Sequence, residues 1–296
     1  MTIGYRRPQS REIEAIGSCM VLVPQLDPVI PLLNGLFVAA DGEGEVSLAL
    51  GVNERPVLDV KWSGMLPGEV FAKLERHIAA ADLAGAEVWL PGARQPARLG
   101  DPRAVTIAAD GAPLVVPSGG FAQAHAAMNH VLAGRLLELG QFADGEVVEL
   151  FAGSGNFTVL LARHARGVIA VEANARAVVA ARANLSARAL AAKVVEADAD
   201  AYALPAATRT VVLDPPRTGA RGAMANVLSS RARRVIYISC DPATLGRDLA
   251  QLSPKFRVSQ LETFEMFPQT SHIETLAVLE RATLPAGPSG SSKVRP

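Results

Sequence analysis

Residues 147–158, with the sequence VVELFAGSGNFT, contain the pattern that decides the fold of the larger part of the chain. An apolar, β-branched run predicts a strand, Gly153 and Gly155 predict a tight turn, and the following residues favour a helix. Glycines let the backbone turn sharply and approach a ligand closely. A helix N-terminus directs its free N–H groups to the same place. The stretch therefore indicates a nucleotide-cofactor crevice or, alternatively, a strand-to-helix turn that only requires small residues.

Carboxylates near this turn indicate the type of cofactor. A dinucleotide site requires Gly or Ala where this chain has Thr158. Glu149 would repel a pyrophosphate and suits a ligand with a positive amino or sulfonium group. Glu172 ends the next expected strand, where a carboxylate can accept the hydroxyls of a ribose, and Asp198 follows the third, near an adenine edge. We therefore expect S-adenosylmethionine rather than NAD.

Composition and charge set limits on the function. The chain has 296 residues, of which 49% are hydrophobic and 20% charged, and its net charge is zero. No apolar run approaches the roughly 18 residues that span a membrane, and no secretory signal follows the N-terminus. Cys19 and Cys240 are the two cysteines, too few for a disulfide framework or for a cysteine-only metal site. We expect a cytoplasmic, monomeric protein that binds no metal and no membrane.

Two domains and a tail are expected. Residues 1–117 contain short strand patterns and two helical patterns, and so indicate a small α/β or α+β domain. Its strand patterns are 45–50, 57–62, 87–90 and 105–108, and its helical patterns are 27–36 and 67–80. Arg6, Arg7 and Arg11 form a basic stretch that contacts phosphates or is a solvated arm. Residues 283–296 have the composition of a disordered tail.

Residues 118–282 alternate strand and helix patterns, which predicts an α/β, Rossmann-like domain with a mostly parallel, seven-stranded sheet and an antiparallel last strand. The expected strands are 147–151, 168–172, 193–196, 210–214, 234–239, 256–264 and 272–279. Gln123 lies where the chain enters the first helix of this domain. It either covers the cofactor pocket or is an ordinary surface amide.

Three residues at strand ends can carry chemistry. Asp214 precedes Pro215-Pro216, which stiffens the loop and holds the carboxylate for a planar substrate edge, unless the Asp only starts a turn. Cys240 precedes a helix whose N–H groups favour a thiolate, so we interpret it as a nucleophile rather than as a buried structural cysteine. Glu274 begins the antiparallel strand, where burial would raise its pKa and suit a general base.

Four segments of residues 118–282 resemble a known family. In this order, LFAGSGNFT, LDPPRTG, YISCDPATLGRDL and MFPQTSHIETLAVL are similar to the RNA 5-methyluridine methyltransferases, class I enzymes that use S-adenosylmethionine on tRNA or rRNA. The resemblance implies that the cofactor is bound by Gln123, Phe151, Gly153, Gly155, Asn156, Glu172, Asp198 and Asp214. It assigns the nucleophile to Cys240, the base to Glu274 and substrate contacts to Asp214 and Arg217. In the implied reaction Cys240 adds to C6 of uracil, and Glu274 removes the proton from C5.

The chain also departs from this family. Many members begin with a β-barrel RNA-binding module, and none precedes Gly4. Some members carry an iron–sulfur cluster on four cysteines, of which Cys19 resembles the last. Either this chain has no cluster, which we expect, or the protein has a further N-terminal part that this sequence does not include. Two other functions stay open: an N-methyltransferase, because an acid-Pro-Pro motif can also serve amino groups, and an RNA-binding homologue without catalysis.

Overall fold

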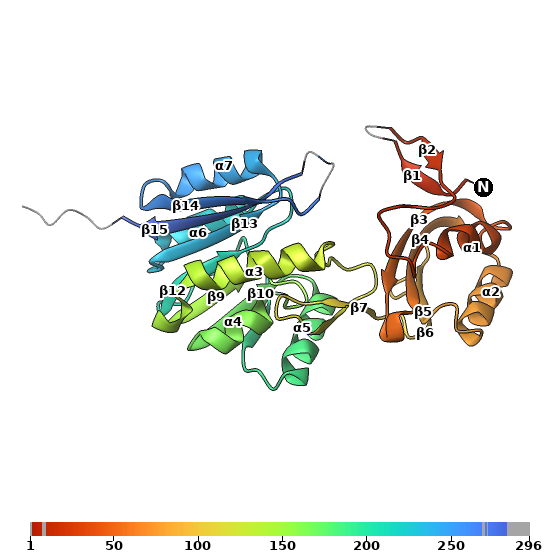
Figure 1. Cartoon of the computed structure of the whole chain (residues 1–296), viewed down its shortest axis with the longest axis horizontal. Coiled ribbons are helices and arrows are strands. Elements are labelled where there is room, and N and C mark those ends of the chain that lie inside the picture. Colours follow the sequence, from red (N-terminus) through yellow and green to blue (C-terminus); the bar gives the residue numbers. More distant parts are fainter. Residues whose placement is uncertain (1, 8–9, 268–269, 271, 283–296) are drawn as a thin grey trace, which may run out of the picture.

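A computed structural model describes residues 2–7, 10–267, 270 and 272–282 of the chain. The predicted disordered tail, residues 283–296, lies outside the described residues. Figure 1 shows two bodies side by side, the N-terminal domain in red to orange and the C-terminal domain in green to blue. The parallel strands of the C-terminal domain end on the side that faces the N-terminal domain.

The C-terminal domain is built on a seven-stranded sheet with the order β11-β10-β9-β12-β13-β15-β14. Its strands are β9 (Glu146–Leu150), β10 (Gly167–Glu172), β11 (Lys193–Glu196), β12 (Thr208–Leu213), β13 (Arg234–Ser239), β14 (Phe256–Phe264) and β15 (Glu274–Arg281). The first five pair in parallel, and β15 lies antiparallel between β13 and β14. The predicted Rossmann-like sheet with an antiparallel last strand is therefore confirmed.

Helices cover both faces of this sheet because alternate strand residues are apolar on each side. The helices are α3 (Ala126–Gly140), α4 (Thr158–His164), α5 (Ala175–Ala187), α6 (Arg221–Ser229) and α7 (Pro242–Leu252). Helices α3 and α4 share a core with Val212, Ile238 and Leu276. Helices α6 and α7 pack on the opposite face, in a core with Leu213 and Tyr237. The strand order reverses at β9, with β10 on one side and β12 on the other, and sheets of this kind bind ligands at the carboxyl ends of the strands at such a point.

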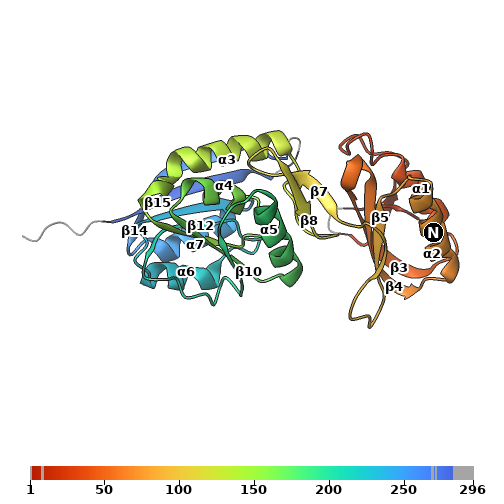
Figure 2. The ribbon, with the colours of Figure 1, turned by 90° about the horizontal axis from the view of Figure 1, so that it is seen from below.

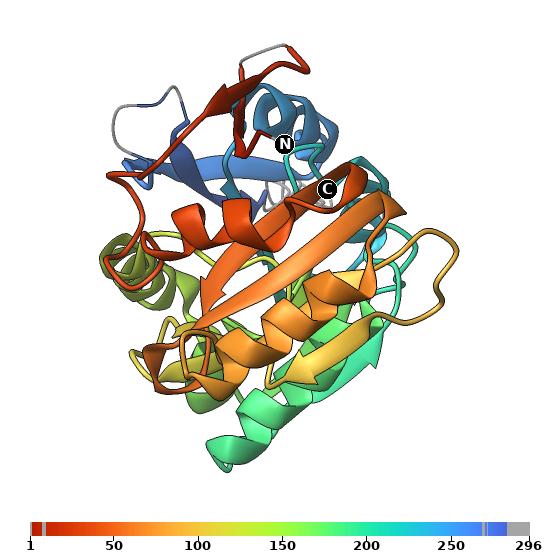
Figure 3. The ribbon, with the colours of Figure 1, turned by 90° about the vertical axis from the view of Figure 1, so that its right-hand side faces the viewer.

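The N-terminal domain has a four-stranded sheet with the order β3-β4-β5-β6 and two helices on one face. Its elements are β3 (Asp41–Leu50), β4 (Pro56–Met65), β5 (Gly85–Trp89), β6 (Ala97–Gly100), α1 (Val29–Leu36) and α2 (Gly68–Ala79), after a short hairpin of β1 (Gly4–Arg6) and β2 (Ile13–Ala15). Figure 3 views the molecule from this domain, with its helices in front of the C-terminal domain. The strand β6 and the hairpin β1–β2 were absent from the sequence prediction because their patterns are short and exposed.

A second hairpin, β7 (Ala104–Ile107) with β8 (Pro113–Val116), lies between the two domains in the view of Figure 2. Its apolar residues share a core with α5. The side chain of Asn184 in α5 pairs with both backbone groups of Val115, at 2.9 and 2.8 Å. The sequence prediction placed this hairpin in the domain of residues 1–117. The same core also contains Val57 and Ala84 of the N-terminal domain, and β7 contacts β3, so the hairpin packs against both domains.

Charged side chains connect the two domains. Glu87 of β5 is buried and accepts hydrogen bonds from Arg98 of β6 at 3.0 Å and from Arg176 of α5 at 2.5 Å. The guanidinium of Arg176 also lies 5.7 Å from the ring centroid of Trp89. These contacts place the N-terminal domain beside the helix that follows Glu172. No helix in the described ranges is both long and apolar enough to span a bilayer.

Candidate active site

The glycine turn after β9 has an unusual backbone. Phe151, Gly153 and Gly155 have φ values of 62°, 56° and 89°, so three residues in five adopt the left-handed region. For Phe151 this conformation costs about 1–3 kcal/mol, and such strain concentrates at functional sites. A Cβ at Gly153 would meet nothing within 4 Å, so the turn is open at this residue. The local sequence pattern predicts the turn at the two glycines but not the strained backbone of Phe151. Phe151 entered the predicted site only through the family resemblance.

Glu172 lies beside this turn, as predicted. Its carboxylate accepts the backbone N–H of Gly153 at 2.8 Å and that of Asn174, also at 2.8 Å. The acid therefore fixes the end of β10 against the glycine turn. Asp198 follows β11, the neighbour of β10, and is exposed, with one oxygen accepting the N–H of Asp200 at 2.9 Å. Both acids lie at the carboxyl ends of adjacent strands, where the sequence placed them.

The side chain of Asn156 faces protein groups instead of the crevice. Its Oδ1 accepts from the N–H of Ala109 at 2.9 Å, and its amide exchanges hydrogen bonds of 3.0 and 2.9 Å with the buried Asn129 of α3. These hydrogen bonds occupy the amide, and the cofactor contact that the resemblance assigns to Asn156 stays a prediction. The pairing connects the glycine turn to α3 and to the β7–β8 hairpin.

Glu149 also differs from the expectation. It is 3% exposed and accepts a hydrogen bond from the hydroxyl of Thr158 at 2.6 Å. Burial raises its pKa to about 8, and the carboxylates of Asp214 and Glu172 add to the effect. At neutral pH this side chain is mostly uncharged and lies beneath the turn. The sequence interpretation treated Glu149 as an anion beside a cationic ligand, and burial disfavours that charged form.

Strand register brings Asp214, Cys240 and Glu274 to one edge of the sheet. Ser239 pairs with Thr275 across antiparallel strands, so Cys240 and Glu274 occupy the next opposed positions. Leu213 pairs with Tyr237, so Asp214 follows at the same end of the neighbouring strand. The side chains two residues nearer the sheet centre, Val212, Ile238 and Leu276, all belong to the core beneath α3. By strand alternation the three functional residues occupy positions on that same face.

The two carboxylates at this edge have raised pKa values. Glu274 is 4% exposed, and burial raises its pKa to about 7, as the sequence led us to expect. Burial and the nearby charge of Glu274 raise the pKa of Asp214 to about 8. Gln123 opposes this rise because its Nε2 donates to Asp214 Oδ2 at 3.3 Å. Gln123 is 9% exposed and therefore not an ordinary surface amide, and its role at the cofactor stays a prediction.

The pKa of the Cys240 thiol differs from the sequence-based expectation. The helix N-terminus was expected to favour the thiolate, yet burial and the charge of Glu274 raise the pKa of the thiol. Asp241 caps α7 by accepting the N–H of Thr244 at 2.8 Å, which places a second carboxylate there. Arg217 is the group that favours the thiolate. Its Nη2 lies 3.2 Å from His272 Nε2, a pairing that the sequence did not predict although His272 precedes Glu274 at the same edge.

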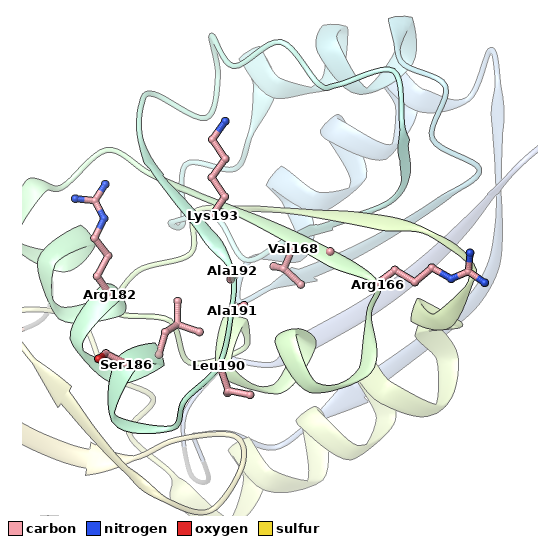
Figure 4. Close-up of a pocket in the computed structure, with 10 residues that line it drawn as sticks. Arg166, Val168, Arg182, Ser186, Leu190, Ala191, Ala192 and Lys193 are labelled. Carbon is pink, nitrogen blue, oxygen red and sulfur yellow. The ribbon is translucent and has the colours of Figure 1, made fainter.

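Features elsewhere in the molecule do not extend this site. Cys19 lies in the N-terminal domain, where its sulfur accepts a hydrogen bond from the hydroxyl of Tyr5 at 3.5 Å. Among the described residues no three His, Cys, Asp or Glu side chains are grouped to hold a metal ion. An open depression of about 640 Å³ lies at the opposite, amino-terminal ends of β10 and β11. Figure 4 shows Arg166 and Lys193 at its border, pointing in different directions.

Comparisons with known proteins agree with this geometry. The family model of the tRNA (uracil-5-)-methyltransferases matches residues 115–204 and 192–282, more than half of the chain. The chain is 34% identical over 293 residues to the 23S rRNA (uracil(1939)-C(5))-methyltransferase RlmD of Pseudomonas entomophila, with 95% of this chain and 64% of the relative covered. The enzyme of the same name from Cronobacter sakazakii is 32% identical over 292 residues, with 95% and 67% covered.

A solved structure shows the same fold. The tRNA (uracil-54, C5)-methyltransferase of Pyrococcus abyssi, in complex with S-adenosyl-L-homocysteine, superposes with a TM-score of 0.74 at 20% identity, covering 94% of this chain and 72% of that one. The chain spans about two thirds of the length of these relatives. Together, the match to the family model and the sequence relatives show that the chain belongs to the tRNA (uracil-5-)-methyltransferase family.

Proposed function

We propose that this chain transfers a methyl group from S-adenosylmethionine to C5 of a uridine in RNA. The observation that carries the proposal is the register of β12, β13 and β15, which brings Asp214, Cys240 and Glu274 to one edge beside the glycine turn. The relatives from Pseudomonas and Cronobacter are named as 23S rRNA methyltransferases, which favours ribosomal RNA over tRNA as the substrate.

The residues around the glycine turn fit the cofactor. Gly153 and Gly155 have left-handed backbone, the turn is open at Gly153, and Glu172 presents its carboxylate next to it. We propose that these residues bind the cofactor together with Phe151, Gln123, Asp198 and Asp214, with Asn156 contributing only through its backbone. When bound there, S-adenosylmethionine supplies an electrophilic methyl group.

The thiol of Cys240 and the carboxylate of Glu274 perform the chemistry on the base. The thiolate of Cys240 adds to C6 of uracil, and the electron pair of the C5–C6 double bond moves towards C5, which becomes nucleophilic enough to take the methyl group. The bond between the methyl group and the sulfonium sulfur breaks, its electron pair stays on that sulfur, and neutral S-adenosylhomocysteine is the leaving group. C5 then carries both a hydrogen and the methyl group. Glu274 accepts that hydrogen as a proton, and the C6–S bond breaks to restore the double bond and the thiolate. A pKa of about 7 suits this proton transfer at neutral pH.

The uridine must leave its stack to reach this edge. A base inside a helix cannot present C5 and C6 to both a sulfur and a methyl donor, so the nucleotide must be single-stranded or flipped out. We propose that the N-terminal domain contacts the RNA, because it faces the edge that holds the site (Figure 1). Asp214 and Arg217 lie on one loop at this edge and are proposed to hold the uracil.

A methyltransferase acting on a nitrogen is the main alternative, since the Asp214-Pro-Pro segment can also serve an amino group. Nitrogen has its own lone pair and needs no thiol addition. The discriminating experiment is therefore Cys240→Ala, assayed by transfer of labelled methyl groups to uridine-containing RNA, with nucleoside analysis of the product.

We expect Cys240→Ala to lose at least about a thousandfold in rate while it still binds S-adenosylhomocysteine, because only the covalent step is removed. The matched control is Cys19→Ala, which removes the other cysteine and should leave the rate unchanged. Activity retained by Cys240→Ala on uridine would refute the covalent route. A methylated amino nitrogen in the product would establish the alternative.

A further inference from the structure

The segment GRDL at residues 246–249 has no part in the chemistry above, yet two of its side chains hold the loop that carries Asp214 and Arg217. Asp248 of α7 is fully buried, with 0% exposure, on the α6–α7 face of the sheet. Its Oδ2 accepts from the hydroxyl of Tyr237 and from the N–H of Ala220, both at 2.7 Å. Its Oδ1 accepts from Arg247 Nε at 2.9 Å. A carboxylate with this many donors is firmly fixed.

The loop lies tightly against this pair of side chains. Arg247 Nη2 donates to the carbonyl of Thr218 at 2.8 Å. Gly219 has a φ of +77°, and a Cβ there would lie 2.4 Å from Arg247 Nη2 and 2.5 Å from Asp248 Oδ2. Only glycine permits both this backbone conformation and this approach. The loop is thus held at consecutive residues from Thr218 to Ala220.

These contacts connect two segments that each carry a residue of the site. Helix α7, which contains Asp248, begins directly after Cys240 and Asp241. The loop that Asp248 and Arg247 hold begins at Asp214 and includes Arg217, the cation that stabilises the thiolate of Cys240. The position of Arg217 relative to the sulfur therefore depends on contacts made on the opposite face of the sheet.

We propose that Asp248, acting with Arg247, is a positioning residue that fixes the loop from Asp214 to Ala220 relative to Cys240. Its consequence for methyl transfer rests on the proposed function. Its consequence for the thiol does not, because the charge of Arg217 acts on Cys240 whether or not RNA is a substrate. A loosened loop moves Arg217 away, and the thiol then ionises at higher pH.

The test measures the ionisation of Cys240 directly. In a Cys19→Ala background Cys240 is the single cysteine, and its alkylation by iodoacetamide is followed by intact mass from pH 6 to 10. We expect Asp248→Asn to raise the midpoint of the alkylation profile and to slow the reaction about threefold at pH 8. Arg217→Gln should give a shift of similar size, and the double variant should shift no further, because both changes remove the same interaction.

Two further variants keep the test decisive. Asn184→Ala removes a buried polar side chain on α5 that pairs with Val115 and not with this loop. It should lower the melting temperature without moving the alkylation profile. If Asp248→Asn does not fold, Arg247→Gln replaces it, because that side chain is 39% exposed and still contacts Thr218.

The outcomes separate this proposal from the proposed function. An alkylation profile of Asp248→Asn, or of Arg247→Gln, that equals the parent's would overturn the positioning role even if the melting temperature falls. A shifted profile in a protein that methylates no uridine would support the positioning role and reject the proposed function. With methylation present, we expect kcat to fall in step with the alkylation rate while KM for the cofactor changes little.

Discussion

Asp248 and Glu274 are both buried carboxylates of the C-terminal domain, but they lie on opposite faces of its sheet and in different surroundings. Asp248 accepts hydrogen bonds from a tyrosine, an arginine and a backbone N–H. Glu274 shares its edge with Asp214, and burial raises their pKa values to about 7 and about 8. Donors fix a charge in place, whereas burial without enough donors makes a group ready to exchange a proton near neutral pH. One face of the sheet therefore holds the loop, and the other holds the groups that titrate.

The largest effect, on the rate of methyl transfer, should follow from replacing Glu274. We expect Glu274→Gln to slow methyl transfer at least about a hundredfold, because no carboxylate remains to take the proton from C5. Since thiol addition and methylation precede that step, the variant should accumulate RNA covalently attached to Cys240. Denaturing gel electrophoresis with labelled RNA measures this product.

The control for this change is Glu265→Gln, an exposed carboxylate just after β14 that should leave the rate unaffected. Full turnover by Glu274→Gln would show that Glu274 is not the base. Glu274 would then differ from Asp248 only in its surroundings, because its raised pKa would serve no proton transfer.

A smaller effect is expected in the pH dependence of cofactor binding. Asp214 and Glu274 are mostly protonated at pH 6 and mostly charged at pH 9. A sulfonium near them stabilises the charged forms, so the affinity for S-adenosylmethionine should rise with pH across this range, with release of a proton on binding. S-adenosylhomocysteine lacks the sulfonium charge and should show a weaker slope. Isothermal titration in buffers of different ionisation enthalpy measures both quantities.

Asp214→Asn should flatten this slope, since it removes one of the two titrating groups, although it should also weaken binding. Equal slopes for the two ligands would contradict the placement of the sulfonium beside these carboxylates. The same measurement on Glu265→Gln should reproduce the parent slope, because that carboxylate is exposed just after β14.

The sequence predicted the edge of the sheet well because topology alone brings its residues together. Asp214, Cys240 and Glu274 each follow or begin an apolar strand, and parallel strands with one antiparallel neighbour place those ends side by side. The direction of their side chains follows from strand alternation. Neither inference needs knowledge of any particular contact.

The sequence predicted less where a residue has several possible partners. The amide of Asn156 pairs with Asn129 and with the N–H of Ala109, in the turn of a hairpin distant in sequence, and the sequence predicted neither partner. The pKa of Cys240 depends on a balance between burial, Glu274 and Arg217 rather than on the helix alone. Such outcomes depend on tertiary contacts that no local pattern encodes. The GRDL segment was visible in the sequence, but its contact with Gly219 was not.

The smallest expected effect is on stability, where Glu149→Gln and Asp248→Asn should change the melting temperature in opposite directions at pH 9. The pKa of Glu149 is about 8 in the folded protein against 4.5 for the free side chain. The folded protein therefore keeps a proton that the unfolded chain releases, and stability falls as pH rises from about 4.5 to about 8. Glu149→Gln carries no such titration, so its melting temperature should exceed the parent's at pH 9 by more than at pH 6.

Asp248→Asn should instead lower the melting temperature at both pH values, because it weakens hydrogen bonds that a carboxylate makes. Scanning calorimetry at pH 6 and pH 9 checks both signs. A change for Glu149→Gln that is equal at the two pH values would mean that Glu149 is charged throughout, and the two faces of the sheet would then hold their buried acids in the same way.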